Sequence, residues 1–457
     1  MSAPASASAS APASASGRVH PDDIRSRFSA ALSAMYRAEV PQYGELLTLV
    51  AEINAEALKR DPALARRLDQ AGDLARLSEE RHGAIRVGTA EELSTIARAF
   101  AVMGMEPVSY YNLAPAGVPV HSTAFRPTDP EALRRNPFRV FCSLLRLELV
   151  EDAALREEAA ATLARRDIFT PAARALIETA ERQGGLDEAQ ADRFVAELLE
   201  TFRWHAEATV SAQTYERLVA AHRLIADVVS FKGPHINHLT PRTLDIDAAQ
   251  AAMPARGITP KETIEGPPAR ACPILLRQTS FKALEEKIAF PGDRGAVAGT
   301  HTARFGEIEQ RGCALTPTGR ALYDAALAKK DFSALPDDWT ALRRQGLAWF
   351  RYAPSEQGLS RAGALSGDLD SLVAAGDAVV QPITYEDFLP ISAAGIFQSN
   401  LGSEARGSAY AVDPAKADFE AALGRAVQDE MALYQAEQDA SMAATLKALG
   451  VSRRVTA

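Results

Sequence analysis

Arg304-Phe-Gly-Glu-Ile-Glu-Gln-Arg-Gly312 is the stretch around which the rest of this 457-residue chain can be organised. Its residues alternate in character, which predicts a strand with two different faces that ends at a glycine. Glu307 and Glu309 share one face of this strand, and Ile308 lies on the other. Because an unpaired buried carboxylate is very costly, the strand is either an exposed edge or carries a glutamate that binds a positive group.

The composition predicts a globular protein with a sizeable core, since 47% of the residues are hydrophobic. A net charge of -9 and a pI near 5.6 argue against nucleic-acid binding, although a local basic pocket for a small acid remains compatible with them. The sequence contains no apolar run long enough to cross a membrane. From the charge we expect no nucleic acid as partner, and from the lack of such a run we expect no membrane. The cysteines Cys142, Cys272 and Cys313 are far apart and form no CxxC motif, which fits a cytoplasmic protein.

The N-terminal 80 residues divide into two parts. Residues 1–18 are almost entirely Ala, Ser and Pro, without the apolar segment of a secretory signal, and are predicted to be a disordered tail. Residues 19–80 carry apolar side chains at helical spacing, for example Ile24, Phe28 and Leu32. We expect these N-terminal helices to pack against the central domain.

A strand–helix–strand–strand order occurs twice in the chain. In residues 81–130 a strand begins at His82, a helix follows Thr89, which is expected as its N-cap, and two further strands come next. In residues 231–315 the same order leads from a strand at His238 to the stretch that ends at Gly312. A repeated supersecondary unit predicts an α+β fold built from two similar modules.

The remaining segments are predicted to be mainly helical. Residues 131–230 form a helical insertion, in which Phe141, Leu144 and Leu145 begin an apolar face, and residues 316–457 form a mostly helical C-terminal region. We expect both regions to pack around the two modules.

Two histidines and one carboxylate on a common face can hold an octahedral metal and leave three positions open, as non-haem Fe(II) oxygenases require. The candidates are His82 and His238, each on the first strand of a module, and Glu307 on a last strand. Alternatives stay open, because Glu309 shares the face of Glu307, and because an isolated histidine is more often an ordinary structural residue.

Other histidines compete with these candidates. His235 is three residues before His238, and on one strand the two would point to opposite faces. His121 and His301 are also within range of the modules, whereas the histidines of the tail and the helical regions are expected to be structural: His20, His205 and His222.

Arg86 lies four residues after His82, on the same strand face and roughly 13 Å along an extended chain. Its guanidinium could pair with the distal carboxylate of a metal-bound substrate. The alternative is an ordinary surface salt bridge.

Four motifs resemble a known family. Phe305–Gly312 is similar to the ligand-bearing strand of 4-hydroxyphenylpyruvate dioxygenase, a member of the vicinal oxygen chelate superfamily, and this similarity favours Glu307 over Glu309 as a ligand. More closely, four segments in this order resemble the 2-oxoadipate dioxygenase/decarboxylase family, also called D-2-hydroxyglutarate synthase, from about residue 20 to the C-terminus: His82–Arg86, His235–Arg242, Thr300–Gly312 and Leu389–Phe397.

The resemblance implies two vicinal-oxygen-chelate-like βαβββ modules that form a central sheet or half-barrel around a metal, with extensive helical insertions. It implies Fe(II) as cofactor and a lysine-catabolic reaction in which 2-oxoadipate and dioxygen give (R)-2-hydroxyglutarate and carbon dioxide. By motif, His82, His238 and Glu307 would bind the iron.

The resemblance also implies where the substrate binds. Arg86 would hold the distal carboxylate of 2-oxoadipate, His82 would border the substrate, and Ile391 and Ser392 would line the pocket in a segment near residues 385–400. Where the family has valine this chain has Ile391, which would change the pocket by one methylene, so the resemblance defines the reaction more closely than the preferred chain length of the substrate.

Two rival functions fit the same scaffold: a metal-dependent isomerase or lyase, and a non-catalytic protein that binds a small acid. The discriminating feature is whether His82, His238 and Glu307 converge at metal-ligand distances, about 2 Å each from one ion.

Overall fold

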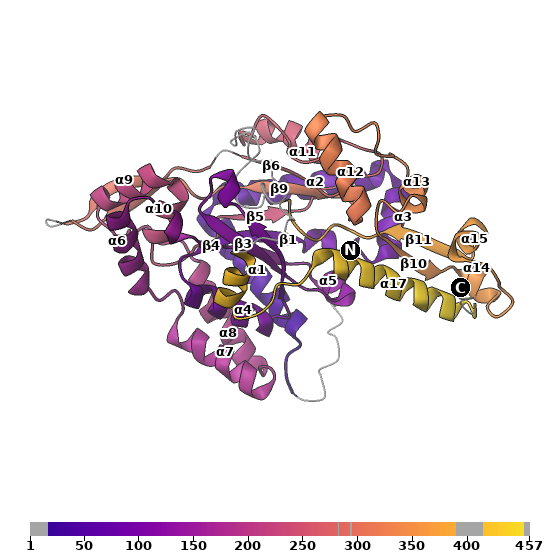
Figure 1. The fold of residues 1–457 in the computed structure, drawn as a ribbon, viewed down its shortest axis with the longest axis horizontal. Coiled ribbons are helices and arrows are strands. Elements are labelled where there is room, and N and C mark those ends of the chain that lie inside the picture. Colours follow the sequence, from indigo (N-terminus) through magenta and orange to yellow (C-terminus); the bar gives the residue numbers. More distant parts are fainter. Residues whose placement is uncertain (1–16, 282, 293–294, 390–414, 452–457) are drawn as a thin grey trace, which may run out of the picture.

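The computed structural model describes residues 17–281, 283–292, 295–389 and 415–451. Residues 1–16 of the predicted tail lie outside this range. Within it, helices surround a central β-sheet, and the C-terminal helix lies along a lobe that projects from one end of the sheet (Figure 1). The predicted α+β architecture is confirmed.

The N-terminal region is helical, as predicted. Each of its α-helices begins with a proline, whose fixed φ suits the first helical turn and whose missing N–H costs nothing there. The elements are α1 (Pro21–Glu39), α2 (Pro41–Arg60), α3 (Pro62–Ala71) and the 3₁₀ turn η1 (Ala75–Ser78).

The first module has the order β-α-β-β-β. Its elements are β1 (Arg81–Val87), α4 (Ala90–Val102), β2 (Glu106–Asn112), β3 (Val120–Arg126) and β4 (Arg139–Leu145). Thr89 is the N-cap of α4, and its side chain accepts a hydrogen bond from the Glu92 N–H. The strands form one sheet in the order β2-β3-β4-β1-β5, in which β4 runs parallel to β1.

Strand β4 corrects the prediction that the helical insertion begins at residue 131. Phe141, Leu144 and Leu145 belong to a strand in which every residue is buried. It lies between β3 and β1 with apolar layers on both faces, so its sequence is a nearly continuous apolar run without polar alternation. Such a run cannot be told from a buried helix by periodicity alone.

The second module begins with the strand that carries His238. Its elements are β5 (His238–Pro241), α11 (Ile246–Ala252), the 3₁₀ turn η5 (Met253–Arg256), β6 (Leu276–Ser280), β7 (Glu286–Phe290), β8 (Val297–His301) and β9 (Glu307–Arg311). Strands β7 and β8 form a separate hairpin, and β9 pairs antiparallel with β6.

The two modules meet at β5 and β9. Strand β5 pairs antiparallel with β1, and a parallel bridge joins Arg242 to Glu309 on β9. The Thr243 N–H donates to the Glu309 carbonyl at 2.7 Å. The strands β1, β5, β9 and β6 therefore follow one another, and the predicted ligand-bearing strands are neighbours.

The remaining helices cover the sheet and form the projecting lobe. Between the modules lie α5 (Pro130–Arg135), η3 (Leu147–Leu149), α6 (Ala153–Ala164), α7 (Pro171–Gln183), α8 (Glu188–Leu199), η4 (Glu200–Phe202), α9 (Ala212–Ala221) and α10 (Arg223–Val229); η2 (Ala114–Ala116) joins β2 to β3. The C-terminal region contains α12 (Pro317–Lys329), α13 (Trp339–Arg344), β10 (Phe350–Pro354), α14 (Glu356–Ser360), α15 (Leu369–Ala374), β11 (Ala378–Pro382), α16 (Ala415–Leu423) and α17 (Glu430–Ala448). Its two strands, β10 and β11, form an antiparallel hairpin against which α17 packs.

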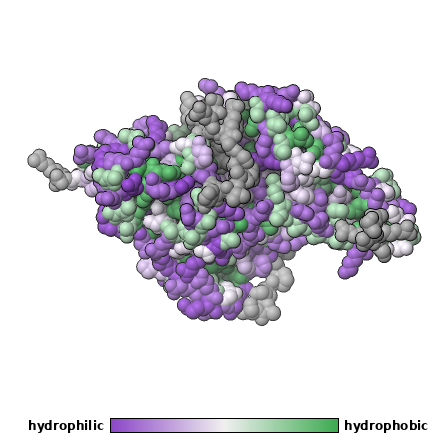
Figure 2. All heavy atoms as spheres, viewed as in Figure 1, coloured by the Kyte–Doolittle hydropathy of each residue, from purple (hydrophilic) through white to green (hydrophobic). Residues whose placement is uncertain are grey.

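The side chains of β1 divide between two apolar cores. Ile85 and Val87 face a core shared with α1, α4, α7 and α8, whereas Ala84 faces the other core. His82 and Arg86 alternate with Ile85 and therefore share the face of Ala84. On the outside, hydrophobic residues are interspersed among hydrophilic ones on the face that Figure 2 shows. No described helix combines the length and apolar character that a bilayer crossing needs.

Candidate metal centre

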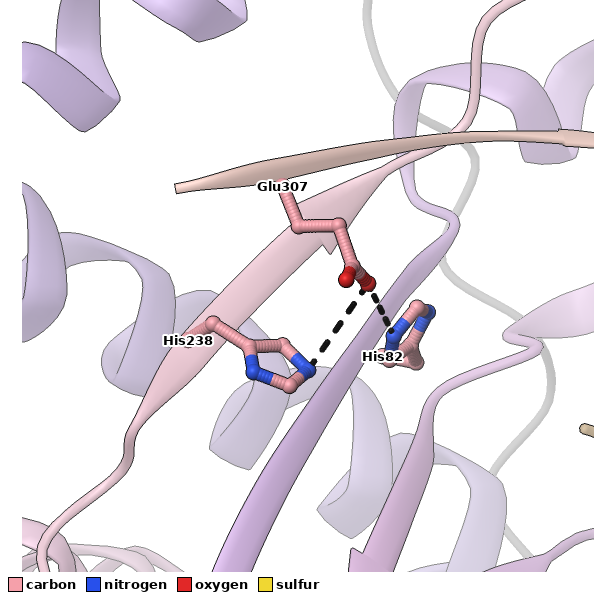
Figure 3. A group of neighbouring side chains, drawn as sticks. All are labelled: His82, His238 and Glu307. Carbon is pink, nitrogen blue, oxygen red and sulfur yellow. Dashed lines mark ion pairs between the residues drawn. The ribbon is translucent and has the colours of Figure 1, made fainter. Parts of the chain in front are cut away.

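The three predicted ligand candidates converge from three neighbouring strands. His82 comes from β1, His238 from β5 and Glu307 from β9, and their side chains point toward one another (Figure 3). One ligand atom from each lies within 4.8 Å of the other two. All three side chains are almost completely buried, which rules out the exposed-edge alternative for β9.

The two imidazoles approach the same carboxylate oxygen. Nε2 of His82 lies 3.1 Å from Oε1 of Glu307, and Nε2 of His238 lies 3.9 Å from it. The ring centroids are 5.3 Å apart and the rings are nearly perpendicular. The His82–Glu307 approach is short but lacks hydrogen-bonding geometry, as expected of atoms arranged around a common ligand.

Glu307 has a carboxylate oxygen that could bind a cation. Its Oε1 accepts hydrogen bonds from Oγ1 of Thr240 at 3.0 Å and from Nε2 of Gln278 at 2.9 Å. Its Oε2 is buried and has no hydrogen-bond partner among the described residues. A buried carboxylate oxygen left in this state is costly, and a metal ion would satisfy it. Two imidazoles and one carboxylate can hold such an ion and leave coordination positions open.

Glu309 occupies a different place from Glu307, which sequence spacing could not reveal. Its Oε2 lies 2.9 Å from Nδ1 of His82, the nitrogen on the far side of the ring from Glu307. Arg311 donates to both oxygens of Glu309, at 2.8 and 2.9 Å. Both oxygens are therefore occupied, and the carboxylate is placed to fix the orientation of the His82 ring.

Electrostatics set the charges of these groups in the metal-free protein. Burial raises the pKa of Glu309, but the charges of Arg311 and His82 outweigh it and lower that pKa to about 2. Burial and the positive charges of His82 and Arg86 hold the pKa of His238 well below its ordinary value, so its ring is a neutral base. For His82, burial opposes but does not cancel the effect of the two glutamates, and its pKa is raised.

Behind Glu309 lies a buried network of charged side chains that sequence reasoning missed. Glu80 is its centre and contacts the guanidinium groups of Arg139 and Arg242, each at 2.9 Å. The positive charges around Glu80 outweigh its burial and hold its pKa well below the ordinary range. The other members are Arg76, Arg311 and Glu386. Apart from Arg76 and Glu80, which are four residues apart, the members come from distant parts of the chain, so no local pattern identified the network.

Aromatic rings shield the two imidazoles. The Phe388 ring lies 4.9 Å from that of His82, and the Phe305 ring lies 4.8 Å from that of His238. The Phe388 carbonyl accepts a hydrogen bond from the Tyr385 hydroxyl at 2.8 Å, and the preceding residue, Asp387, accepts two from Arg126, at 2.6 and 2.9 Å. The predicted pocket residues Ile391 and Ser392 follow shortly after and lie outside the described residues.

Arg86 is part of a buried ion pair and not of a surface salt bridge. Its Nη1 lies 2.7 Å from Oδ2 of Asp227, and the Arg86 side chain is only 12% exposed. The side chain shares the β1 face of His82, and its charge acts on His238. The predicted contact with a substrate carboxylate stays a prediction.

The competing histidines lie elsewhere. His235 precedes β5 in a turn with a φ of 21°, so the strand alternation that was expected to separate it from His238 does not apply. His235 and His301 gather with Asp227 in a second buried group. His121 packs against Tyr110 and Phe419.

Comparison with known proteins gives a consistent result. A family model described as 2-oxoadipate dioxygenase/decarboxylase matches residues 28–400. A Pseudomonas putida protein named 2-oxoadipate dioxygenase/decarboxylase is 55% identical, over 95% of this chain and 98% of the relative. An Escherichia coli protein of the same name is 57% identical, over 92% and 97%. The crystal structure of the hydroxyglutarate synthase in complex with 2-oxoadipate from Pseudomonas putida matches with a TM-score of 0.88 and 54% identity, over 95% of this chain and 100% of that one.

Proposed function

We propose, because the chain belongs to the 2-oxoadipate dioxygenase/decarboxylase family, that it converts 2-oxoadipate and dioxygen into 2-hydroxyglutarate and carbon dioxide. The reaction balances: the six carbons of the substrate become a five-carbon hydroxy acid and one carbon dioxide, and both oxygen atoms of dioxygen are incorporated. The observation that carries the proposal is the convergence of His82, His238 and Glu307 with one buried carboxylate oxygen unpartnered.

His82, His238 and Glu307 would hold Fe(II), which when bound would activate dioxygen for oxidative decarboxylation and hydroxylation. The three strands already place the donor atoms together, so little reorganisation is needed for binding. Glu309, whose Oε2 lies 2.9 Å from Nδ1 of His82, would orient the ring so that Nε2 faces the metal. The aromatic rings of Phe388 and Phe305 exclude water from the imidazoles.

Arg86 would recognise the distal carboxylate of the substrate. It lies on the same face of β1 as His82, and a guanidinium forms strong, directional hydrogen bonds with a carboxylate. Held at both ends, the 2-oxo acid would keep its reacting carbons beside the metal site while bonds break. Ile391 and Ser392 would complete the pocket, as their motif implies.

The three cysteines are free and buried, which supports a reducing cytoplasmic location.

The test is oxygen uptake by the Fe(II)-loaded protein supplied with 2-oxoadipate, with carbon dioxide and 2-hydroxyglutarate measured in the same reaction. We expect one carbon dioxide and one 2-hydroxyglutarate for each dioxygen consumed. Absence of uptake with iron verified as bound would refute the proposal and favour a metal-dependent isomerase or lyase, or a protein that only binds a small acid.

A further inference from the structure

A second buried cluster lies directly behind Arg86. Its centre is Asp227 on α10, whose side chain is 6% exposed. Oδ2 of Asp227 lies 2.7 Å from Nη1 of Arg86 and accepts a long hydrogen bond of 3.5 Å from Nδ2 of Asn237. Oδ1 lies 2.9 Å from Nε2 of His301 and 3.1 Å from Nε2 of His235. One carboxylate thus connects β1, α10, the turn before β5 and the end of β8.

The two imidazoles are themselves fixed in place. The Tyr215 hydroxyl lies 2.8 Å from Nδ1 of His301. The Trp204 indole stacks on the His301 ring, with a centroid distance of 6.0 Å and an interplanar angle of 12°, and meets the His235 ring edge-on at 4.8 Å. Neither ring can turn away from Asp227 without disrupting this packing.

We propose that Asp227 is the positioning residue for Arg86, and that the cluster behind it makes the site selective for 2-oxo acids with a second carboxylate. The inference rests on the proposed role of Arg86 as the distal-carboxylate ligand. A free arginine side chain loses considerable rotamer entropy when it is ordered by a ligand. Because Asp227 already holds the guanidinium, a dicarboxylic substrate meets a preorganised partner.

The same three groups could be considered a second metal site, since Asp227, His235 and His301 offer ligand atoms within 4.8 Å of one another. The charge argues against it. Arg86 already neutralises Asp227, and a divalent ion would add two positive charges next to its guanidinium, which lies 2.7 Å from the same carboxylate. An ion pair between Asp227 and Arg86 explains the cluster without any added charge.

The test uses Asp227→Asn, which keeps the shape of the side chain but removes its charge. Two substrates are compared: 2-oxoadipate, and 2-oxohexanoate, which has the same six-carbon chain without the distal carboxylate. We expect kcat/KM for 2-oxoadipate to fall roughly 10- to 100-fold, mostly through KM, because a small misplacement of a binding group has effects of this size. For 2-oxohexanoate we expect no change. Asp22→Asn is the matched control, since Asp22 also forms a buried pair with an arginine, Arg25, at 2.8 Å, near the start of α1.

A double-mutant cycle shows whether Asp227 acts through Arg86. In an Arg86→Ala background, Asp227→Asn should have no further effect on 2-oxoadipate. His301→Phe keeps the aromatic packing but removes the contact with Asp227, and should repeat the selective loss if Asp227→Asn does not fold. Four results would each overturn the inference. Two are kinetic: equal losses of kcat/KM with both substrates, and additive effects in the double-mutant cycle. Two concern binding: tighter binding of 2-oxoadipate by Asp227→Asn, and a second metal ion that is bound by the parent protein and lost in this variant.

Binding separates this inference from the proposed function. The affinity for 2-oxoadipate is measured by calorimetry on the iron-loaded protein without oxygen, so a protein that binds the acid without turning it over still reports on Asp227. If the protein does not turn over 2-oxoadipate but its affinity for this acid depends on Asp227, only the proposed reaction is refuted. Normal turnover with an affinity independent of Asp227 would refute the inference alone.

Discussion

Glu307→Gln and Glu309→Gln should weaken metal binding to different degrees and should differ in their effect on the stability of the apo-protein, although the residues are two positions apart on one strand face. Glu307 carries a buried oxygen without a partner among the described residues, whereas both oxygens of Glu309 accept hydrogen bonds from Arg311 and one lies 2.9 Å from Nδ1 of His82. We expect Glu307→Gln to abolish metal binding and leave the apo-protein at least as stable. We expect Glu309→Gln to weaken metal binding moderately and to destabilise the fold.

The magnitudes follow from these contacts. Loss of a group that orients a metal-bound histidine typically lowers metal affinity 10- to 100-fold, or about 1.4 to 2.7 kcal/mol, so this is expected for Glu309→Gln. The same change removes the nearer carboxylate of the fully buried Arg311 and leaves it the more distant Glu80, at 3.7 Å, so the cost should stay below the about 3 to 5 kcal/mol of folding free energy that breaking a buried pair typically takes. Loss of the ligand itself should lower the metal affinity of Glu307→Gln more than about 100-fold, while removal of a buried carboxylate with one unpartnered oxygen relieves the apo-protein.

The assay has two parts. Fe(II) is titrated into apo-protein without oxygen, in competition with a chromogenic chelator, and the free energy of unfolding of each apo-protein is measured in urea. Glu262→Gln, an exposed glutamate in the same half of the chain, is the control and should match the parent in both parts. Wild-type metal affinity in Glu309→Gln would refute its role in orienting His82. Normal loading of Glu307→Gln with loss in Glu309→Gln would show that the two roles are exchanged.

Three further predictions concern stability. Burial and the charge of Asp387 raise the pKa of Glu430 to about 7, against about 4.3 in the unfolded chain. The protonated Glu430 therefore contributes to the free energy of unfolding at acidic pH, and this contribution is lost as the pH rises to 7. Glu430→Gln should reduce the fall in stability, measured in urea, between pH 5 and 8. The buried Tyr36 hydroxyl donates, at 2.7 and 3.1 Å, to two backbone carbonyls beside the ligand-bearing strands, so Tyr36→Phe should cost about 1 to 3 kcal/mol in the same measurement. A Cβ on Gly312 would lie 2.2 Å from the backbone of Pro273, so Gly312→Ala should lower the thermal midpoint by several degrees or prevent folding, whereas unchanged melting would contradict this packing.

Much of the architecture followed from local patterns. The strand at His82, the N-cap at Thr89 and the helical N-terminal region were confirmed, because alternation, capping and helical spacing are properties of neighbouring residues. The resemblance to the 2-oxoadipate dioxygenase/decarboxylase family was confirmed as well. Strand β4 was assigned wrongly, because burial on both faces removes the alternation that identifies a strand.

The sequence by itself determined the α+β order, the family and the three residues that converge as candidate ligands. Spacing gives the two glutamates of β9 the same face, and the resemblance favoured Glu307; only the tertiary structure decided their contacts, in which Arg311 donates to Glu309 while Oε2 of Glu307 stays without a partner among the described residues. The tertiary structure also decided that Arg86 is held by Asp227, 141 positions along the chain. Local pattern fixes the direction in which a side chain points, but its partner comes from whichever distant segment the fold brings to that face.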